Sequence, residues 1–336
     1  MKIKRLIFVL CVLGIVTLCM AYMNSKYDPL ARYPYQGEEM RETIRENLTR
    51  KEMEYIIEYS INPDLFIDYI EVNRFNIYHA TEYKYISNFL WTDGYEYPDP
   101  SDVVSIVEST WGQISKEELG VYLSHYGFED MEEWFDKKEI YNSESTLIKS
   151  PNRIETYMNS DLSVFRYEPK NLVSLDDLVP TNSSDEIKVT ADVLKSWEQL
   201  CVDIESELSI KNCAGLVIEE GFVSYEEQVV QYQNAVAEYG DEALKFVDYP
   251  GHSENQLGLA IDFTIRGVKD AEQTDAIQYQ WLMEKAHLYG FIQSYTLKDS
   301  TFINRVPALN HLRYVGVDLA TYLFNETLSF SEYNAK

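Results

Sequence analysis

Two short motifs constrain this chain of 336 residues more than any other feature of its sequence. The first is Ser253-Glu-Asn-Gln-Leu-Gly-Leu-Ala-Ile-Asp262, whose apolar second half predicts a strand over 258–265. The second is His311-Leu-Arg-Tyr-Val-Gly316, which predicts a strand over 311–315. Taken singly, an aspartate at a strand end is usually a turn or capping residue, and a histidine among apolar neighbours usually belongs to a core. The two motifs are informative because they occur together.

Together they resemble the active-site framework of the VanY-type D-alanyl-D-alanine carboxypeptidases, zinc enzymes that trim peptidoglycan stem peptides. In that family the two motifs read S-E-H-Q-x-G-x-A-x-D and E-P-W-H-x-R-Y-V-G. The resemblance covers about residues 172–323 and implies the family's fold for that part of the chain. By this register, Asp262 and His311 match two of the family's three zinc ligands.

The same register puts substitutions at the positions that carry the family's chemistry. Asn255 stands where the resemblance implies the remaining zinc-binding histidine, and an amide oxygen is a weak donor for Zn²⁺. Ala308, three residues before His311, stands at the glutamate that acts as general base. Val223 replaces the arginine that holds the carboxylate of the substrate. The substitutions therefore affect a zinc ligand, the general base and the arginine that holds the substrate.

Two further positions depart from the family, since Asn310 replaces a tryptophan and Ser294 an arginine. His252 is a candidate replacement ligand, although the pattern places it on a loop that faces elsewhere. Other polar residues of the family's motifs are retained in this chain. They either line a peptide groove or serve as caps and turn residues, and they are Ser224, Gln228, Ser253 and Gln256.

These residues predict a carboxypeptidase-like protein that no longer hydrolyses, with vestigial metal positions at Asp262 and His311 and no bound zinc. Its expected partners are peptidoglycan stem peptides or wall-synthesis proteins. Two alternatives stay open. One is an active zinc carboxypeptidase with a reorganised site, and the other is a structural ectodomain whose former cleft is packed shut.

The N-terminus predicts export. Met1-Lys-Ile-Lys-Arg5 precedes an apolar run over 6–23, which is 18 residues or about 27 Å of helix, enough to cross a hydrocarbon core. Residues 1–24 are therefore expected to form a single-pass anchor with the body outside the cell membrane. Secretion after cleavage at the weak site Cys19-Met-Ala21 is the alternative. The formal charge of -27 disfavours nucleic acid as a partner.

In an exported body, Cys201 and Cys213 either form a disulfide or remain two buried thiols. The body itself is predicted to have two parts. Residues 161–336 form the carboxypeptidase-like domain, an α+β fold with a small, mainly antiparallel sheet and a helix over 225–239. Residues 25–160 form a helical region.

The helical region is expected to contain two repeat units. Thr49 is a predicted N-cap for a helix through Tyr59, and apolar spacing predicts another helix over 65–70. The six residues 48–53 match 114–119, and 64–69 resemble 130–135. We expect this region to serve as a spacer or a partner-binding module.

Overall fold

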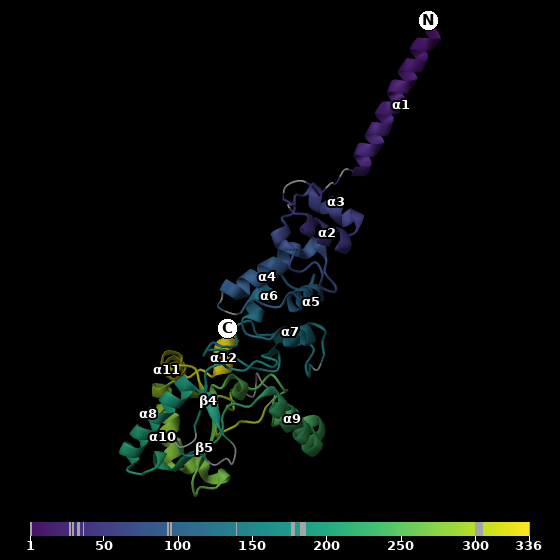
Figure 1. Cartoon of the computed structure of the whole chain (residues 1–336). Coiled ribbons are helices and arrows are strands. Elements are labelled where there is room, and N and C mark those ends of the chain that lie inside the picture. Colours follow the sequence, from purple (N-terminus) through teal and green to yellow (C-terminus); the bar gives the residue numbers. More distant parts are fainter. Residues whose placement is uncertain are drawn as a thin grey trace. The chain divides into compact units, whose positions relative to one another are not determined.

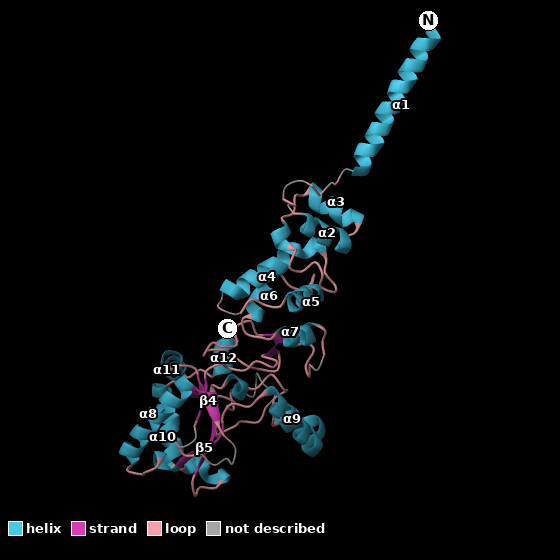
Figure 2. Ribbon diagram, in the orientation of Figure 1, coloured by secondary structure: helices cyan, strands magenta, loops and turns pink. Residues whose placement is uncertain are grey.

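The computed structural model describes residues 2–26, 28, 30–31, 34–35, 37–92, 94, 96–138, 140–175, 179–181, 186–299 and 305–335. Their contacts divide the chain into two compact units, Met1–Lys116 and Glu117–Lys336 (Figure 1). All strands of the described residues lie in the second unit (Figure 2).

The division at 116/117 differs from the predicted boundary at 160/161 because residues 117–160 pack within the second unit. Strand β1 (Thr146–Leu147) pairs in parallel with β2 (Leu162–Ser163). The guanidinium of Arg166 lies 2.6 Å from Oε2 of Glu133. These contacts join the end of the predicted helical region to the predicted carboxypeptidase-like domain.

The first unit is helical in its described residues. Its elements are α1 (Lys2–Lys26), α2 (Glu38–Asn47), α3 (Arg50–Glu58), η1 (Pro63–Leu65), η2 (Ile77–His79), α4 (Ala80–Thr92) and α5 (Pro100–Thr110). The Thr49 hydroxyl accepts a hydrogen bond from the backbone of Glu52, whose carboxylate accepts from the backbone of Thr49. This capping box confirms Thr49 as the N-cap. The core of the unit includes Ile44, Ile56, Phe66 and Ile77.

The two proposed repeat units share a structure only in their first segments, since residues 48–53 lead into α3 and residues 114–119 lead into α6 (Lys116–Leu123). In the first copy, Asn62 caps the short 3-10 helix η1 and Pro63 starts it, after which the chain continues in turns. In the second copy, the matching residues lie in the α-helix α7 (Phe128–Phe135). The predicted helix over 65–70 is therefore wrong. The two-repeat organisation is not supported.

Helix α1 covers most of the predicted anchor over residues 1–24. Within the part of the chain that the structure describes, no helix has both the length and the apolar character that crossing a membrane requires.

The second unit is built around a four-stranded sheet of order β5-β6-β8-β7, in which every neighbouring pair is antiparallel. The strands are β5 (Leu216–Glu220), β6 (Ala260–Ile265), β7 (Phe291–Gln293) and β8 (His311–Tyr314). A separate hairpin pairs β3 (Leu172–Ser174) with β4 (Lys188–Thr190). The predicted α+β class with a mainly antiparallel sheet is confirmed for this unit.

The second unit also contains helices. They are α6 (Lys116–Leu123), α7, α8 (Ala191–Leu208), α9 (Tyr225–Tyr239), α10 (Ile277–Lys285), α11 (Val317–Glu326) and α12 (Phe330–Asn334). In Figure 1, α8, α10 and α11 lie to one side of β5 and α9 lies to the other. Trp197 of α8 is 1% exposed and packs edge-on against Phe291 of β7, with ring centroids 6.0 Å apart. This contact fixes α8 on the sheet.

Gly258 makes the turn that leads into the central strand. It follows the 3-10 helix η5 (Glu254–Leu257) and has φ +64°, in the left-handed region that favours glycine. A Cβ at this position would lie 2.7 Å from Cδ2 of Leu172. The turn lets η5 fold back beside β6, so that residues of both elements reach one place.

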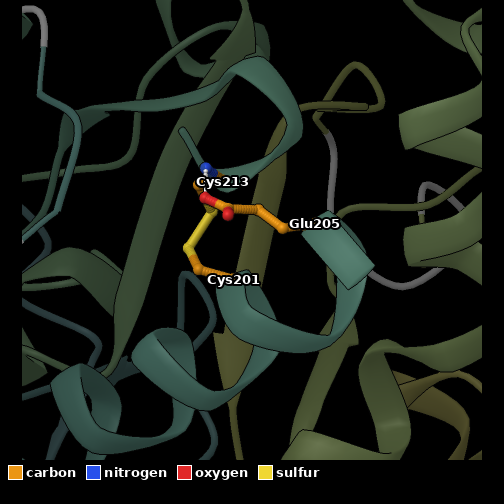
Figure 3. The surroundings of a disulfide bond; sticks show 3 residues. All are labelled: Cys201, Glu205 and Cys213. Atoms are coloured by element: carbon orange, nitrogen blue, oxygen red, sulfur yellow. Dashed lines mark hydrogen bonds between the residues drawn. A yellow bond between two sulfur atoms is a disulfide. The ribbon is translucent and has the colours of Figure 1, made fainter. Parts of the chain in front are cut away.

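Cys201 and Cys213 form a disulfide, with Cα atoms 4.4 Å apart (Figure 3). The carboxylate of Glu205, one turn further along α8, accepts a hydrogen bond from the backbone N–H of Cys213 at 2.6 Å. The bridge ties α8 to the segment that enters β5. Of the two states left open by the sequence, the structure contains the disulfide.

Removal of this bridge should lower the stability of the second unit. For a loop of this length, the chain-entropy model predicts a loss of about 3 kcal/mol for a Cys201→Ala/Cys213→Ala variant. Urea unfolding of the variant and the natural protein under non-reducing conditions measures the difference. Equal unfolding midpoints would contradict the expectation, and reduction of the natural protein should reproduce the loss.

Candidate functional site

The central strands bring Asp262 and His311 together. The two residues are direct partners in the β6–β8 register, and Nδ1 of His311 lies 3.1 Å from Oδ1 of Asp262. The His311 side chain is 2% exposed and that of Asp262 is 22% exposed. The two positions that match family ligands are therefore adjacent, with His311 buried and Asp262 partly exposed.

The other nitrogen of His311 contacts a carboxylate that was not expected from the sequence. Nε2 lies 3.1 Å from Oε2 of Glu254, which is 2% exposed. The Ser294 hydroxyl donates to the same oxygen at 2.6 Å, and Nε of Arg313 lies 3.9 Å from the other oxygen. Each ring nitrogen of His311 therefore has a carboxylate partner.

These contacts set the charge of the site. Burial alone lowers the pKa of His311, but the charge of Asp262 and hydrogen bonds to Asp262 and Glu254 outweigh it and raise the pKa to about 9. Burial alone raises the pKa of each carboxyl. For Asp262 the charge of His311 reverses this, and for Glu254 the hydrogen bond from His311 does so, so both pKa values lie below their usual range. At neutral pH the site is an imidazolium between two carboxylates.

Asn255 completes this network. Its amide Nδ2 donates to Oδ2 of Asp262 at 3.0 Å and to the carbonyl of Gly221 at 3.0 Å. The amide therefore presents its N–H₂ group to the carboxylate. Its side chain is buried, so this arrangement satisfies a polar group that would otherwise be costly to enclose.

These residues do not fit a catalytic zinc ion. Such an ion requires three protein ligands with free lone pairs and an open fourth position. Both ring nitrogens of His311 lie 3.1 Å from carboxylate oxygens, and Asn255 donates to Asp262 where a ligand should face the ion. Within the described ranges, no group of three or more His, Cys, Asp or Glu side chains is arranged to hold a metal.

Neither the general-base position, Ala308, nor the position of the substrate-binding arginine, Val223, carries a polar side chain. Ala308 donates its backbone N–H to the carbonyl of Tyr295 at 3.0 Å and offers only a methyl group to the site. Val223 is 5% exposed, so it packs in the interior. Asn310, at the tryptophan position, accepts a backbone hydrogen bond from Phe263 at 3.0 Å.

His252 is held away from this network. Its Nδ1 donates to the carbonyl of Asn159 at 3.0 Å, and its ring contacts Tyr249 edge-on. The side chain is buried, and burial lowers its pKa. Because these contacts direct the ring toward the segment at residue 159, the structure gives no support to His252 as a replacement ligand.

Two of the groove candidates serve as internal cross-links. Gln256 is fully buried and donates to the carbonyls of Phe165 and Tyr167. Gln228, which is 4% exposed, donates to Oε1 of Gln256 at 2.9 Å and accepts from the backbone N–H of Gly251 at 3.1 Å. Their hydrogen-bonding groups are therefore used within the protein, which does not support a place in an open groove.

The two serine candidates are helix caps. Ser224 forms a capping box with Glu227 at the start of α9, and Ser253 accepts a hydrogen bond from the backbone of Asn255 at the start of η5. Both are half-buried, so a role beside a ligand stays a prediction for them.

Glu254 and Arg313 are the functional-site residues that sequence reasoning missed. Arg313 is fully buried and donates to the backbone carbonyls of Ile154 and Thr156, which fixes that segment on β8. Glu254 directly precedes Asn255 in the first motif. Its neighbours Ser253 and Asn255 are polar, so the sequence contains no signal that this glutamate is buried.

Comparisons with known proteins find relatives for the part of the chain that contains this site. Residues 186–317 match the family model described as VanY, D-alanyl-D-alanine carboxypeptidase. A D-alanyl-D-alanine carboxypeptidase of Enterococcus faecalis is 34% identical over 128 residues, which cover 35% of this chain and 46% of the relative. The chain therefore spans less than half of that relative's length. A bifunctional D-Ala-D-Ala dipeptidase and carboxypeptidase of Enterococcus gallinarum is 29% identical, covering 50% of this chain and 85% of the relative.

Among solved structures, the LdcB LD-carboxypeptidase superposes with a TM-score of 0.52 at 26% identity. The match covers 59% of this chain and 92% of that chain. The mixed helix–sheet fold of the second unit is thus of the VanY and LdcB kind. Residues 186–317 of this chain are therefore similar to the VanY family of D-alanyl-D-alanine carboxypeptidases.

Proposed function

We propose that this chain is a non-hydrolysing member of its family, which binds peptidoglycan stem peptides without cleaving them. The observation that carries the proposal is the closed network around His311. Both nitrogens of His311 are hydrogen-bonded to carboxylates, and the Asn255 amide donates a hydrogen bond to Asp262. The groups that match zinc ligands are therefore already paired with other protein groups. No step of the family's hydrolysis can be assigned to the residues at this place.

Loss of the base supports the same conclusion independently of the metal. General acid–base catalysis contributes about 10²–10⁴-fold to such reactions, and Ala308 cannot transfer a proton. Retention of the surrounding frame supports binding, because Ser253, Gly258 and Asp262 keep the family's turn and strand. LdcB, whose fold this unit shares, recognises peptidoglycan, and a related ligand is the natural one to propose here.

The alternative function, a zinc carboxypeptidase with a reorganised site, requires His311 to lose a proton and Asp262 to release Asn255. The adjacency of Asp262 and His311 at 3.1 Å favours this alternative. It stays second because no described side chain supplies the missing third ligand.

Titration with a soluble stem pentapeptide ending in D-Ala-D-Ala tests the proposal. We expect saturable binding by calorimetry, unchanged by a chelator, and no D-alanine in the supernatant. The matched control is the same peptide ending in L-Ala-L-Ala, which should bind more weakly. Release of D-alanine that a chelator stops would establish the enzyme, and absence of saturable binding would establish a packed, purely structural ectodomain.

We also propose that the body lies outside the cell membrane, where stem peptides are found. The Cys201–Cys213 disulfide supports this location, since such bonds persist in oxidising compartments. The basic N-terminus followed by the apolar run over 6–23 supports export. A retained anchor and a cleaved signal peptide leave different N-termini, so mass spectrometry of the mature chain distinguishes them.

A further inference from the structure

A second concave feature lies in the same unit, away from the His311 network. It is a cavity of about 600 Å³ between α10, β7 and α11. Side chains alternate along a strand, so Leu312 of β8 points to the opposite face of the sheet from His311 and Arg313. Leu312 lines the cavity, which therefore lies on the face of the sheet opposite the former metal position.

The walls of this cavity are mainly apolar. The side chains that define it include Leu282, Phe291, Leu312, Leu323, Phe324 and Leu328. Phe324 is 46% exposed and stacks on His287 at 3.7 Å between ring centroids, so the cavity is open on the side of α11. Its volume is in the range of sites that enclose small organic ligands.

Three polar side chains on the walls are already engaged with protein partners. Thr296 donates its hydroxyl to Asp299 at 2.6 Å, and Ser329 accepts from the backbone of Glu332 at 3.2 Å. Gln293 donates to the Tyr279 hydroxyl and to a backbone carbonyl. A sugar or a peptide backbone would lose its own hydrogen bonds to water on entering such a site. A hydrocarbon chain has none to lose.

One formal charge lies among the described lining residues. Lys298 is exposed, and its ammonium donates to the carbonyl of Thr327 at 2.7 Å. His287, the other titratable lining residue, has its pKa lowered by burial and is neutral at pH 7. A single cation beside an apolar cavity favours a ligand with one negative group.

We propose that this cavity binds a long-chain fatty acid, with the hydrocarbon chain among the apolar side chains and the carboxylate at Lys298. The site does not depend on the proposed binding of stem peptides, because it lies on the other face of the sheet. Failure of either activity therefore leaves the other unaffected.

Fluorescence of parinaric acid, a fluorescent long-chain fatty acid, tests this site on the full chain. We expect saturable enhancement that palmitate reverses and that palmitate methyl ester, which lacks the charge, reverses poorly. Lys298→Glu should weaken binding by at least about tenfold, since it replaces attraction with repulsion. The matched control is Lys195→Glu on α8, an exposed lysine that does not line the cavity, and it should bind as the natural protein does.

A bulkier side chain in the cavity tests whether the fatty acid binds there. Leu328→Trp should abolish enhancement while circular dichroism shows an unchanged fold. Equal weakening by Lys298→Glu and Lys195→Glu, or equal competition by palmitate and its methyl ester, would overturn the proposal. So would binding to phosphatidylglycerol vesicles without binding of free parinaric acid, because this would assign the surface to a membrane.

Discussion

A Val223→Arg/Asn255→His/Ala308→Glu variant is expected to take up about one zinc ion per chain, where the natural sequence takes up almost none. The histidine supplies the missing ligand and removes the amide that now donates to Asp262. The glutamate restores a base three residues before His311. Zinc content by mass spectrometry after gel filtration measures uptake, and D-alanine release from stem pentapeptide measures recovered turnover.

The single variants make this result interpretable. Ala308→Glu alone should bind no zinc, because it adds no third ligand, whereas Asn255→His alone should bind zinc without gaining a base. Val223 is buried, so the Asn255→His/Ala308→Glu pair is the safeguard if the arginine impairs folding. A folded pair and a folded triple variant that both lack zinc would show that the register between this chain and the family is wrong.

Glu254→Ala is expected to destabilise the second unit by about 3–5 kcal/mol, the usual cost of removing one partner from a buried ion pair. It would leave Nε2 of His311 without an acceptor and Ser294 without its 2.6 Å hydrogen bond. Arg313 would lose the nearby carboxylate. Urea unfolding, followed by far-ultraviolet circular dichroism, measures the loss.

The comparison that isolates this effect is Glu198→Ala, at an exposed position of α8, which should change stability by no more than about 0.5 kcal/mol. A Glu254→Leu/His311→Leu variant should lose less than the sum of its single variants, since it removes both members of the pair. A loss below about 1 kcal/mol for Glu254→Ala would mean that the pair is not a structural element.

Much of the second unit could be predicted because residues close together in the sequence determine where its helices and strands begin. Ser224 and Glu227 fix the start of α9, and the helix predicted over 225–239 is the one observed. The strands predicted over 258–265 and 311–315 are observed as β6 and β8, and their pairing places Asp262 beside His311. The start and type of these elements required no long-range information.

The rest depended on contacts between residues far apart in the chain. Glu254 was passed over because its partner, His311, lies 57 residues away. For Gln228 and Gln256 the sequence leaves a groove and a structural role open, because their burial comes from the segment around Phe165, which the sequence does not place beside them. The helix expected over 65–70 failed because Asn62 and Pro63 favour a short 3-10 turn, and burial of Phe66 stabilises the turns after it.

The most direct test of the central claim is the zinc content of the natural chain, equilibrated with excess zinc and then separated from free metal by gel filtration. We expect less than about 0.1 zinc ion per chain, because His311 and Asp262 are satisfied by Glu254 and Asn255. A value near one zinc ion per chain, lost when His311 is replaced by alanine, would contradict this claim.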